Sequence, residues 1–232
     1  MTSAMWKDDE ELFALAKREL FPAVVGDILD QMGLTRQFLP QQIRAITPET
    51  VLIGRAMPVL DLDFPSGAAR AGASGLADVP FGRMFAALDD LKRGEVYIAT
   101  GCSFEFALWG GLMSTRARTL GAAGAVLNGM HRDSAEILSL GFPVFSRGAF
   151  AQDQGVRGKV VDFRVPVKIG QAEITPGDLL FGDRDGILVV PRKAEEEALR
   201  RALEKVRTEN QVRKAIENGL STVEAFERFG VM

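Results

Sequence analysis

The sequence predicts an α+β domain or a layered β/β/α domain. Its first half alternates candidate helices and strands, and its second half gives consecutive short strands separated by Gly, Pro and Asp. Helical patterns lie at both ends of the chain. Alternating elements followed by a run of strands are typical of domains in which helices cover one or more sheets.

The N-terminal part predicts two helices and two strands. Residues 8–20 place Leu12, Leu15 and Ala16 on one face, which predicts an amphipathic helix. A second helix starts at Pro22 and ends at Gly33. Residues 34–50 form a polar connection, and 51–56 and 59–62 predict two strands interrupted by a proline.

The middle of the chain contains a long stretch without hydrophobic periodicity. Residues 63–82 are rich in Gly, Ala and Ser, and such a loop in a compact domain is either mobile or functional, for example as a lid over a site. A short helix over 84–91 and a strand over 95–100 follow. The later elements are strands over 142–146, 159–165, 167–174, 179–183 and 187–190, a charged helix over 193–218, and a last helix capped by Ser221. We predict one domain over 1–232 with a C-terminal helical extension over 192–232.

The amino-acid composition limits the classes of function that the chain could have. The chain is 47% hydrophobic and 25% charged, with a net charge of −3, which is ordinary for a globular protein and gives no support for nucleic-acid binding. No apolar run approaches the roughly 20 residues needed to span a bilayer. With one cysteine, Cys102, no disulfide framework is expected, and a cytoplasmic location is predicted. Cys102 is interpreted as a buried thiol rather than a nucleophile.

Residues 109–136 are the stretch with the clearest chemical pattern. Gly110 and Gly111 open a helix whose free backbone N–H groups and dipole favour an anion. A short apolar strand over 123–127 follows, and Arg132 lies near its exit, where its planar fork suits a carboxylate or phosphate. Asp133 supplies a hard oxygen ligand for magnesium or manganese. Together these groups would hold and polarise a 2-oxo acid.

A purely structural interpretation of the same residues is also open. Asp133 and Glu136 have the spacing of a capping box, in which Asp133 would be the N-cap of the next helix. Arg132 would then be an ordinary surface residue, and the glycine pair a tight turn.

Three motifs give a resemblance to a known family. They are Gly110-Gly111-Leu112-Met113 at the helix start, the stretch from Gly121 to Asn128-Gly129 followed by Arg132-Asp133-Ser-Ala-Glu136, and GDLLFGDRDGILVVP over 177–191. The chain, from about residue 21 onward, resembles the RraA-like family. That family includes 4-hydroxy-4-methyl-2-oxoglutarate aldolases, oxaloacetate decarboxylases and proteins named as regulators of ribonuclease activity.

The resemblance implies a fold and a set of roles. The fold would be the swivelling β/β/α type, assembled as a homotrimer or homohexamer with sites between subunits. Arg132 would bind the carboxylate and 2-oxo group of the substrate, and Asp133 would ligate Mg²⁺ or Mn²⁺. Backbone amides around Gly110, Gly111, Leu112 and Met113 would hold the pyruvyl carboxylate. Glu209, on the C-terminal helix, would reach a neighbouring subunit's site.

The implied function is a divalent-metal-dependent lyase that cleaves a 2-oxo acid to pyruvate, by retro-aldol cleavage or by decarboxylation of oxaloacetate. The chain departs from the aldolase pattern at Gly111, where aldolase members have an acidic residue, and at Ser103, where many have aspartate. A glycine at 111 would enlarge the site, remove a charge and admit another leaving fragment. The alternative function is a non-catalytic protein that binds and modulates a ribonuclease.

Overall fold

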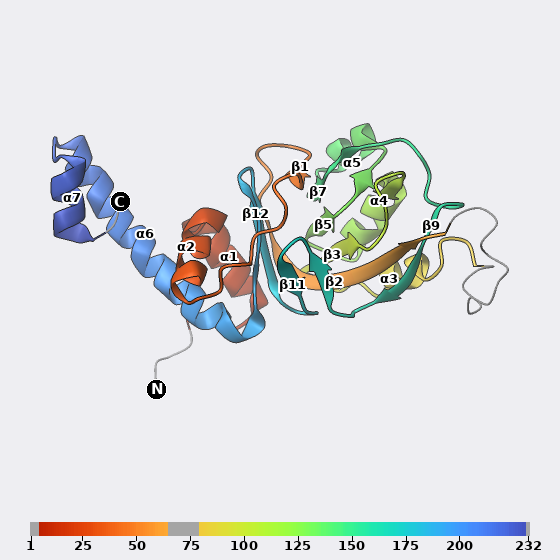
Figure 1. Ribbon diagram of the computed structural model, residues 1–232, viewed down its shortest axis with the longest axis horizontal. Helices are drawn as coiled ribbons and strands as arrows, with labels where there is room; N and C mark the ends of the chain where they lie inside the picture. Colours follow the sequence, from red (N-terminus) through yellow and green to blue (C-terminus); the bar gives the residue numbers. More distant parts are fainter. Residues whose placement is uncertain (1–4, 65–78, 231–232) are drawn as a thin grey trace.

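The fold is built on a mixed β-sheet with helices on its outer faces. The computed structural model describes residues 5–64 and 79–230. The helices are α1 (Asp9–Glu19), α2 (Pro22–Gln31), α3 (Met84–Asp89), α4 (Gly111–Thr119), α5 (Ser134–Leu140), the 3₁₀ turn η2 (Arg192–Ala194), α6 (Glu195–Glu217) and α7 (Thr222–Phe229). In Figure 1, α1 and α2 lie on one side of the sheet and α3, α4 and α5 on the other.

Within the described residues the main sheet has the order β1-β7-β5-β3-β2-β12-β13, with β9 also paired to β2. Its strands are β1 (Arg44–Ala45), β2 (Leu52–Asp63), β3 (Glu95–Thr100), β5 (Gly124–Leu127), β7 (Val144–Ser146), β9 (Gly158–Phe163), β12 (Leu179–Asp183) and β13 (Gly186–Val190). Strands β2, β3, β5 and β7 are parallel neighbours, whereas β12, β13 and β9 pair antiparallel. Smaller sheets join β4 (Ala107–Trp109), β6 (Met130–His131) and β8 (Gly148–Ala149), and β10 (Val167–Ile169) with β11 (Ala172–Ile174).

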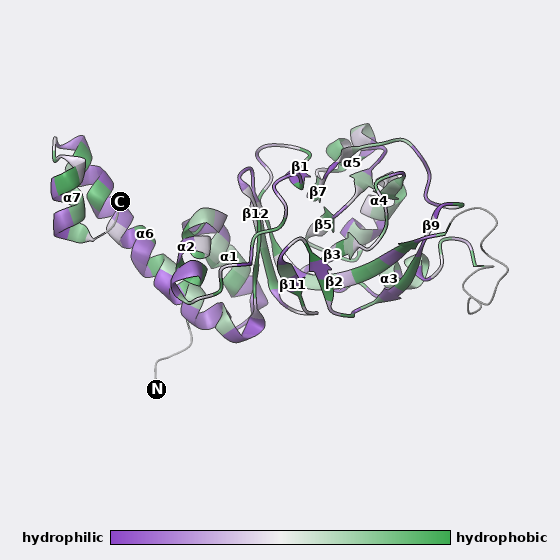
Figure 2. Cartoon of the chain, in the orientation of Figure 1, coloured by the Kyte–Doolittle hydropathy of each residue, from purple (hydrophilic) through white to green (hydrophobic). Residues whose placement is uncertain are grey.

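Alternating side chains divide the core into three clusters. On β3, Val96 and Ile98 point into an inner cluster that the β10–β11 hairpin closes, while Tyr97 and Ala99 pack under α3, α4 and α5. On β12, Phe181 packs against α1, α2 and α6. This arrangement confirms the predicted α+β fold of layered sheets and helices. The C-terminal part of α6 and α7 extend away from the body (Figure 1), and Figure 2 shows both hydrophilic and hydrophobic colouring along this arm.

Two predicted strand boundaries are wrong. The two predicted strands at 51–56 and 59–62 are one strand, β2 (Leu52–Asp63), which runs through Pro58 without a break. The Pro58 carbonyl accepts a 2.7 Å hydrogen bond from the Arg164 N–H. The ring nitrogen of Pro58, which has no hydrogen to donate, faces the same edge of β2 as this carbonyl. On that side β12 pairs up to Arg55 and β9 starts at Val59, so the proline falls in the gap between two partners and no ladder bond is lost.

The second error concerns residues 167–174, which are a hairpin and not one strand. Gly170 turns the chain with φ of +61°, and β10 pairs antiparallel with β11. The helix ends follow the prediction more closely. Ser221 and Glu224 form the expected capping box, and Gly121 follows α4 with φ of +76°.

In the described residues no helix is both long enough and apolar enough to cross a membrane. The predicted lid over residues 63–82 falls mostly on 65–78, which lie outside the described residues.

Candidate active site

Parallel strand pairing brings the predicted site residues together. Strand β4 leads directly into α4, and β6 leads into Arg132 and Asp133. Because β4 and β6 run parallel, both exits lie at the same edge, and the Arg132 N–H donates to the Trp109 carbonyl at 2.9 Å. The start of α4 therefore lies beside the Arg-Asp pair, as the sequence predicts.

Asp133 occupies the predicted N-cap position of α5, but its side chain does not form the capping box. Its backbone is left-handed, with φ of +59°, and its side chain makes no capping hydrogen bond to α5. The carboxylate instead accepts the Gly111 N–H at 3.0 Å, at the first turn of α4. Asp is among the non-glycine residues that tolerate this conformation best, and here it turns the carboxylate away from its own helix.

Arg132 is held by an acid that the sequence analysis missed. Its Nη1 lies 2.9 Å from Asp153 Oδ1, while its Nε lies 3.9 Å from Asp133 Oδ2. The other Asp153 oxygen accepts the Gly155 N–H at 2.6 Å, which fixes the carboxylate in a tight turn. The available signal was the Asp-x-Gly turn pattern at 153–155, but no periodicity connected it to residue 132.

These groups line one end of a cavity of about 300 Å³. Its charged end contains Arg132, Asp133, Asp153 and Gln154. The remaining lining is largely hydrophobic. The side formed by Phe81, α3 and the start of α4 is called the apolar wall; it comprises Phe81, Met84, Phe85, Leu88, Leu112 and Met113. Of the residues predicted to bind substrate, Gly110, Leu112 and Met113 line the cavity, whereas Gly111 is not among its lining residues.

The first turn of α4 leaves two backbone donors for a ligand. The Gly111 N–H is taken by Asp133, and the Ser114 N–H bonds the Gly110 carbonyl at 3.0 Å. The N–H groups of Leu112 and Met113 have no hydrogen-bond acceptor among the described residues. A helix N-terminus with open N–H groups favours an anion, and Arg132 adds a positive charge beside it.

The space above Gly111 is filled, contrary to the expectation of an enlarged and less charged site. A Cβ atom on Gly111 would lie 2.0 Å from Glu136 Oε2, so the Glu136 side chain of α5 occupies the position that a side chain at 111 would need. A carboxylate therefore does lie beside residue 111, but α5 supplies it. The spacing of the two residues in sequence did not reveal this contact.

The donor set at Asp133 fits magnesium bound mainly through water and substrate. Asp133 Oδ2 is engaged by Gly111, and Oδ1 has no protein partner among the described residues. The same residues contain no group of three or more His, Cys, Asp or Glu side chains arranged for a metal. Mg²⁺ commonly binds through one or two carboxylates and retains several waters, so one free carboxylate oxygen in a polar corner is compatible with it.

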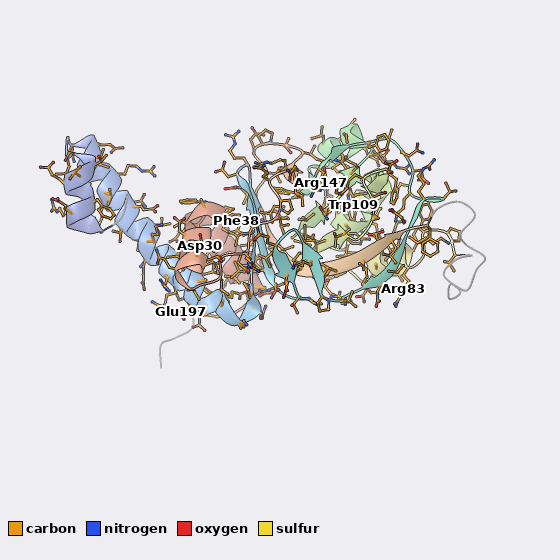
Figure 3. The ribbon with its side chains drawn as sticks, viewed as in Figure 1. Asp30, Phe38, Arg83, Trp109, Arg147 and Glu197 are labelled. Carbon is orange, nitrogen blue, oxygen red and sulfur yellow. The ribbon has the colours of Figure 1, made fainter. Side chains whose placement is uncertain are left out.

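Glu209 lies on α6 and is not among the residues that line the cavity with Arg132. It is on the projecting part of α6, 3.6 Å from Lys205, and lines a surface hollow with Val212 and Ile216. Figure 3 shows Trp109 in the half of the molecule that contains α4 and α5, while Glu197, also on α6, lies in the other half. The proposal that Glu209 serves a neighbouring subunit stays a prediction.

Other polar groups near the site have structural roles. The ring of His131 is buried between the hydroxyls of Ser146 at 2.7 Å and Ser134 at 3.0 Å, and burial lowers its pKa, which favours the neutral ring. Burial raises the pKa of the Cys102 thiol well above its usual range, in agreement with an unreactive thiol. Neither residue lines the cavity.

Asp61 is a buried carboxyl group behind the cavity wall. It is 1% exposed and accepts a 2.8 Å hydrogen bond from Gln154, whose side chain lines the cavity. Burial raises the pKa of Asp61 to about 7, and the Gln154 hydrogen bond opposes that shift. Asp61 therefore anchors a residue of the cavity wall and titrates near neutral pH.

Comparison with known proteins places this fold and site in a family. A family model described as RraA-like, Aldolase/RraA, matches residues 23–189. The chain belongs to the RraA-like family.

Several of the relatives in sequence are named as aldolases. A 4-hydroxy-4-methyl-2-oxoglutarate aldolase of Thermus thermophilus is 31% identical over 105 residues, 45% of this chain and 63% of that protein. A Halalkalibacterium halodurans protein, provisionally given the same name, is 34% identical over 120 residues, 52% of this chain and 57% of that protein. The matched stretches thus span less than two thirds of those relatives.

The solved structures match over a longer stretch. An uncharacterised protein from Pseudomonas syringae is 25% identical with a TM-score of 0.82, covering 99% of both chains. Streptomyces coelicolor RraAS2, described as an unusual member of the RNase ES inhibitor RraA protein family, is 23% identical with a TM-score of 0.75, covering 90% of this chain and 98% of that chain. The second likeness supports the fold alone.

Proposed function

We propose that this protein is a divalent-metal-dependent lyase that cleaves a 2-oxo acid to release pyruvate. The observation that supports it is the convergence of Arg132, Asp133 and the free N–H groups of Leu112 and Met113 at one end of a cavity. The aldolase names of the relatives favour the same reaction class.

The protein groups bind the pyruvyl end of the substrate. The substrate carboxylate accepts hydrogen bonds from the backbone N–H groups of Leu112 and Met113, and the Arg132 guanidinium donates hydrogen bonds to the 2-oxo group. Asp153 holds Arg132 through Nη1, so other guanidinium N–H groups are available to the ligand. Asp133 would hold Mg²⁺ or Mn²⁺, which when bound supplies Lewis-acid polarisation of the 2-oxo group.

Cleavage then follows a retro-aldol course. The C4 hydroxyl loses its proton to water at the cavity mouth, the C3–C4 bond breaks, and its electron pair forms an enolate across C2 and C3. Arg132 stabilises the negative charge on the enolate oxygen, and protonation at C3 yields pyruvate. Decarboxylation of oxaloacetate would give the same enolate, with carbon dioxide as the leaving fragment.

The test is pyruvate release from 4-hydroxy-4-methyl-2-oxoglutarate and from oxaloacetate, with Mg²⁺ and with a chelator. Wild-type protein is expected to release pyruvate only with the metal, and Arg132→Ala is expected to lower kcat/KM at least about 100-fold. Release equal to the metal-only background from both substrates would contradict cleavage of these two acids. The alternative, a protein that modulates a ribonuclease, predicts no turnover and an effect on RNA cleavage when the two proteins are mixed.

A further inference from the structure

The residues that line the cavity are of two unlike kinds, a charged group around Arg132 and the larger apolar wall. Arg132, Asp133, Asp153 and Gln154 supply the polar lining, and the apolar wall supplies much of the remainder. Phe85 and Leu112 lie on the wall with exposed fractions of 56% and 82%. Large hydrocarbon side chains left open beside a cavity gain free energy when a ligand covers them.

The wall presents carbon rather than polar atoms. Phe81 and Phe85 pack edge to face with ring centroids 5.6 Å apart. Trp109 also lines the cavity, but it is 1% exposed and its indole N–H is donated to Ser114 Oγ at 2.6 Å. Its polar atom is therefore satisfied inside the protein, and its ring adds apolar surface.

Among the described residues that line the cavity, no side chain is free to pair with a second carboxylate. Of the described residues that line it, Arg132 is the one cation, and Asp133 and Asp153 are anions beside it. Nearby arginines are engaged elsewhere: Arg83 bonds Asp162 at 2.8 Å, and Arg157 donates to the Asp153 carbonyl at 3.1 Å. A carboxylate placed against the apolar wall would lose its hydration without a partner.

We propose that the substrate is a 4-hydroxy-2-oxo acid with a hydrocarbon group at C4 and no second carboxylate. This inference rests on the proposed lyase function and names the substrate class of the same site. The C3–C4 bond breaks, C4 becomes the carbonyl carbon of an apolar aldehyde or ketone as its hydroxyl proton leaves, and C3 gains a proton to complete pyruvate. The apolar wall holds the released fragment, and Arg132 holds the pyruvyl end.

Binding of unreactive 2-oxo acids tests the inference separately from turnover. Calorimetric titration with Mg²⁺ present would compare 2-oxobutanoate, 2-oxopentanoate and 2-oxohexanoate, and would pair 2-oxopentanoate with 2-oxoglutarate, which has the same chain length. We expect affinity to rise about two- to fourfold per methylene, and 2-oxoglutarate to bind at least about tenfold more weakly than 2-oxopentanoate. Tighter binding of 2-oxoglutarate, or an affinity independent of chain length, would overturn the inference.

A matched pair of variants assigns the effect to the apolar wall. Phe85→Lys places a cation on an exposed position of the wall and is expected to shift the preference toward 2-oxoglutarate at least about tenfold. Phe38→Lys is the control, because Phe38 is 46% exposed and does not line the cavity. An unchanged preference in Phe85→Lys, or an equal change in Phe38→Lys, would contradict the assignment.

Turnover completes the separation of the two proposals. If the lyase function holds, 4-hydroxy-2-oxohexanoate is cleaved with a higher kcat/KM than 4-hydroxy-4-methyl-2-oxoglutarate. Chain-length-dependent binding without any pyruvate release would overturn the lyase function and retain the ligand class. Cleavage that favours the dicarboxylate would retain the lyase and overturn the ligand class, and absence of binding by every 2-oxo acid would overturn both.

Discussion

Arg55 and Arg132 each lie beside two carboxylates, but the two clusters differ in burial and in how fully the guanidinium is bonded. The Arg55 side chain is 9% exposed and is bonded by Asp9 from α1 and by Glu195 from α6. The Arg132 side chain is 38% exposed and has one close partner, Asp153, with Asp133 Oδ2 at 3.9 Å. The same residue types thus form a closed cluster around Arg55 and a more open cluster around Arg132, where we propose that the ligand binds.

The electrostatics follow the same division. Burial alone would lower the pKa of Arg55, but its hydrogen bonds to Asp9 and Glu195 raise it above the usual value. The hydrogen bond from Arg55 lowers the pKa of Asp9. The Arg55 cluster links α1 and α6 to β2, whereas the guanidinium of Arg132 keeps N–H groups without a close partner among the described residues.

The largest expected effect on stability separates the two arginines. Arg55→Ala should lower the free energy of unfolding by about 3–5 kcal/mol, because Glu195 is left buried without its partner. Arg132→Ala should change it by less than about 1 kcal/mol, because its carboxylates are open to water. Urea unfolding of both variants measures this difference, and equal losses would show that burial does not distinguish the clusters.

Asp61 extends the comparison to a buried carboxylate with an amide partner in place of an arginine. Its folded pKa of about 7 lies above the unfolded value of 3.8. Between these two pH values the folded state holds the Asp61 proton while the unfolded chain releases it. Stability contributed by the protonated form is present below about pH 4 and is lost as the pH rises through 7.

Asp61→Asn should therefore raise the free energy of unfolding at pH 8, by up to about 4 kcal/mol for a pKa shift of this size. At pH 4 the same substitution should change the free energy of unfolding little. Thermal or urea unfolding at the two pH values measures it. A variant less stable than wild type at pH 8 would show that the ionised carboxylate is the form that folding favours.

Two glycines give the smallest effects. A Cβ on Gly54 would meet the backbone oxygen of Gly94 at 2.5 Å and Ala123 Cβ at 2.8 Å, so Gly54→Ala should cost about 1–3 kcal/mol. A Cβ on Gly111 would meet the end of the exposed Glu136 side chain, which can move, so Gly111→Ala should cost less than about 1 kcal/mol. Unfolding experiments that ranked Gly111→Ala as the costlier change would mean that Glu136 is rigidly held.

Much of the fold could be predicted, because its signals are local. The apolar run before Gly101 gives β3 with the predicted ends, and Ser221 and Glu224 cap α7 as expected. Pro58 misled the prediction because its cost depends on which strand lies opposite, and that is a property of the whole sheet.

The candidate site shows the same limit. Gly110, Leu112, Met113, Arg132 and Asp133 were found together because they lie within one short stretch of sequence. Asp153 and Gln154 come from a loop about 20 residues away, and only the fold brings them to Arg132. The direction of the Asp133 carboxylate could not be predicted either, because its left-handed backbone reverses the capping pattern that the sequence shows.

The most direct test of the open cluster is whether Asp133, and not Asp153, is the carboxylate that binds the metal. Mn²⁺ titration followed by electron paramagnetic resonance would compare wild type, Asp133→Asn and Asp153→Asn, two matched changes within one cavity. The account predicts that Asp133→Asn weakens Mn²⁺ binding at least about tenfold, while Asp153→Asn keeps the wild-type affinity. Wild-type affinity in Asp133→Asn would contradict the assignment of the metal to Asp133.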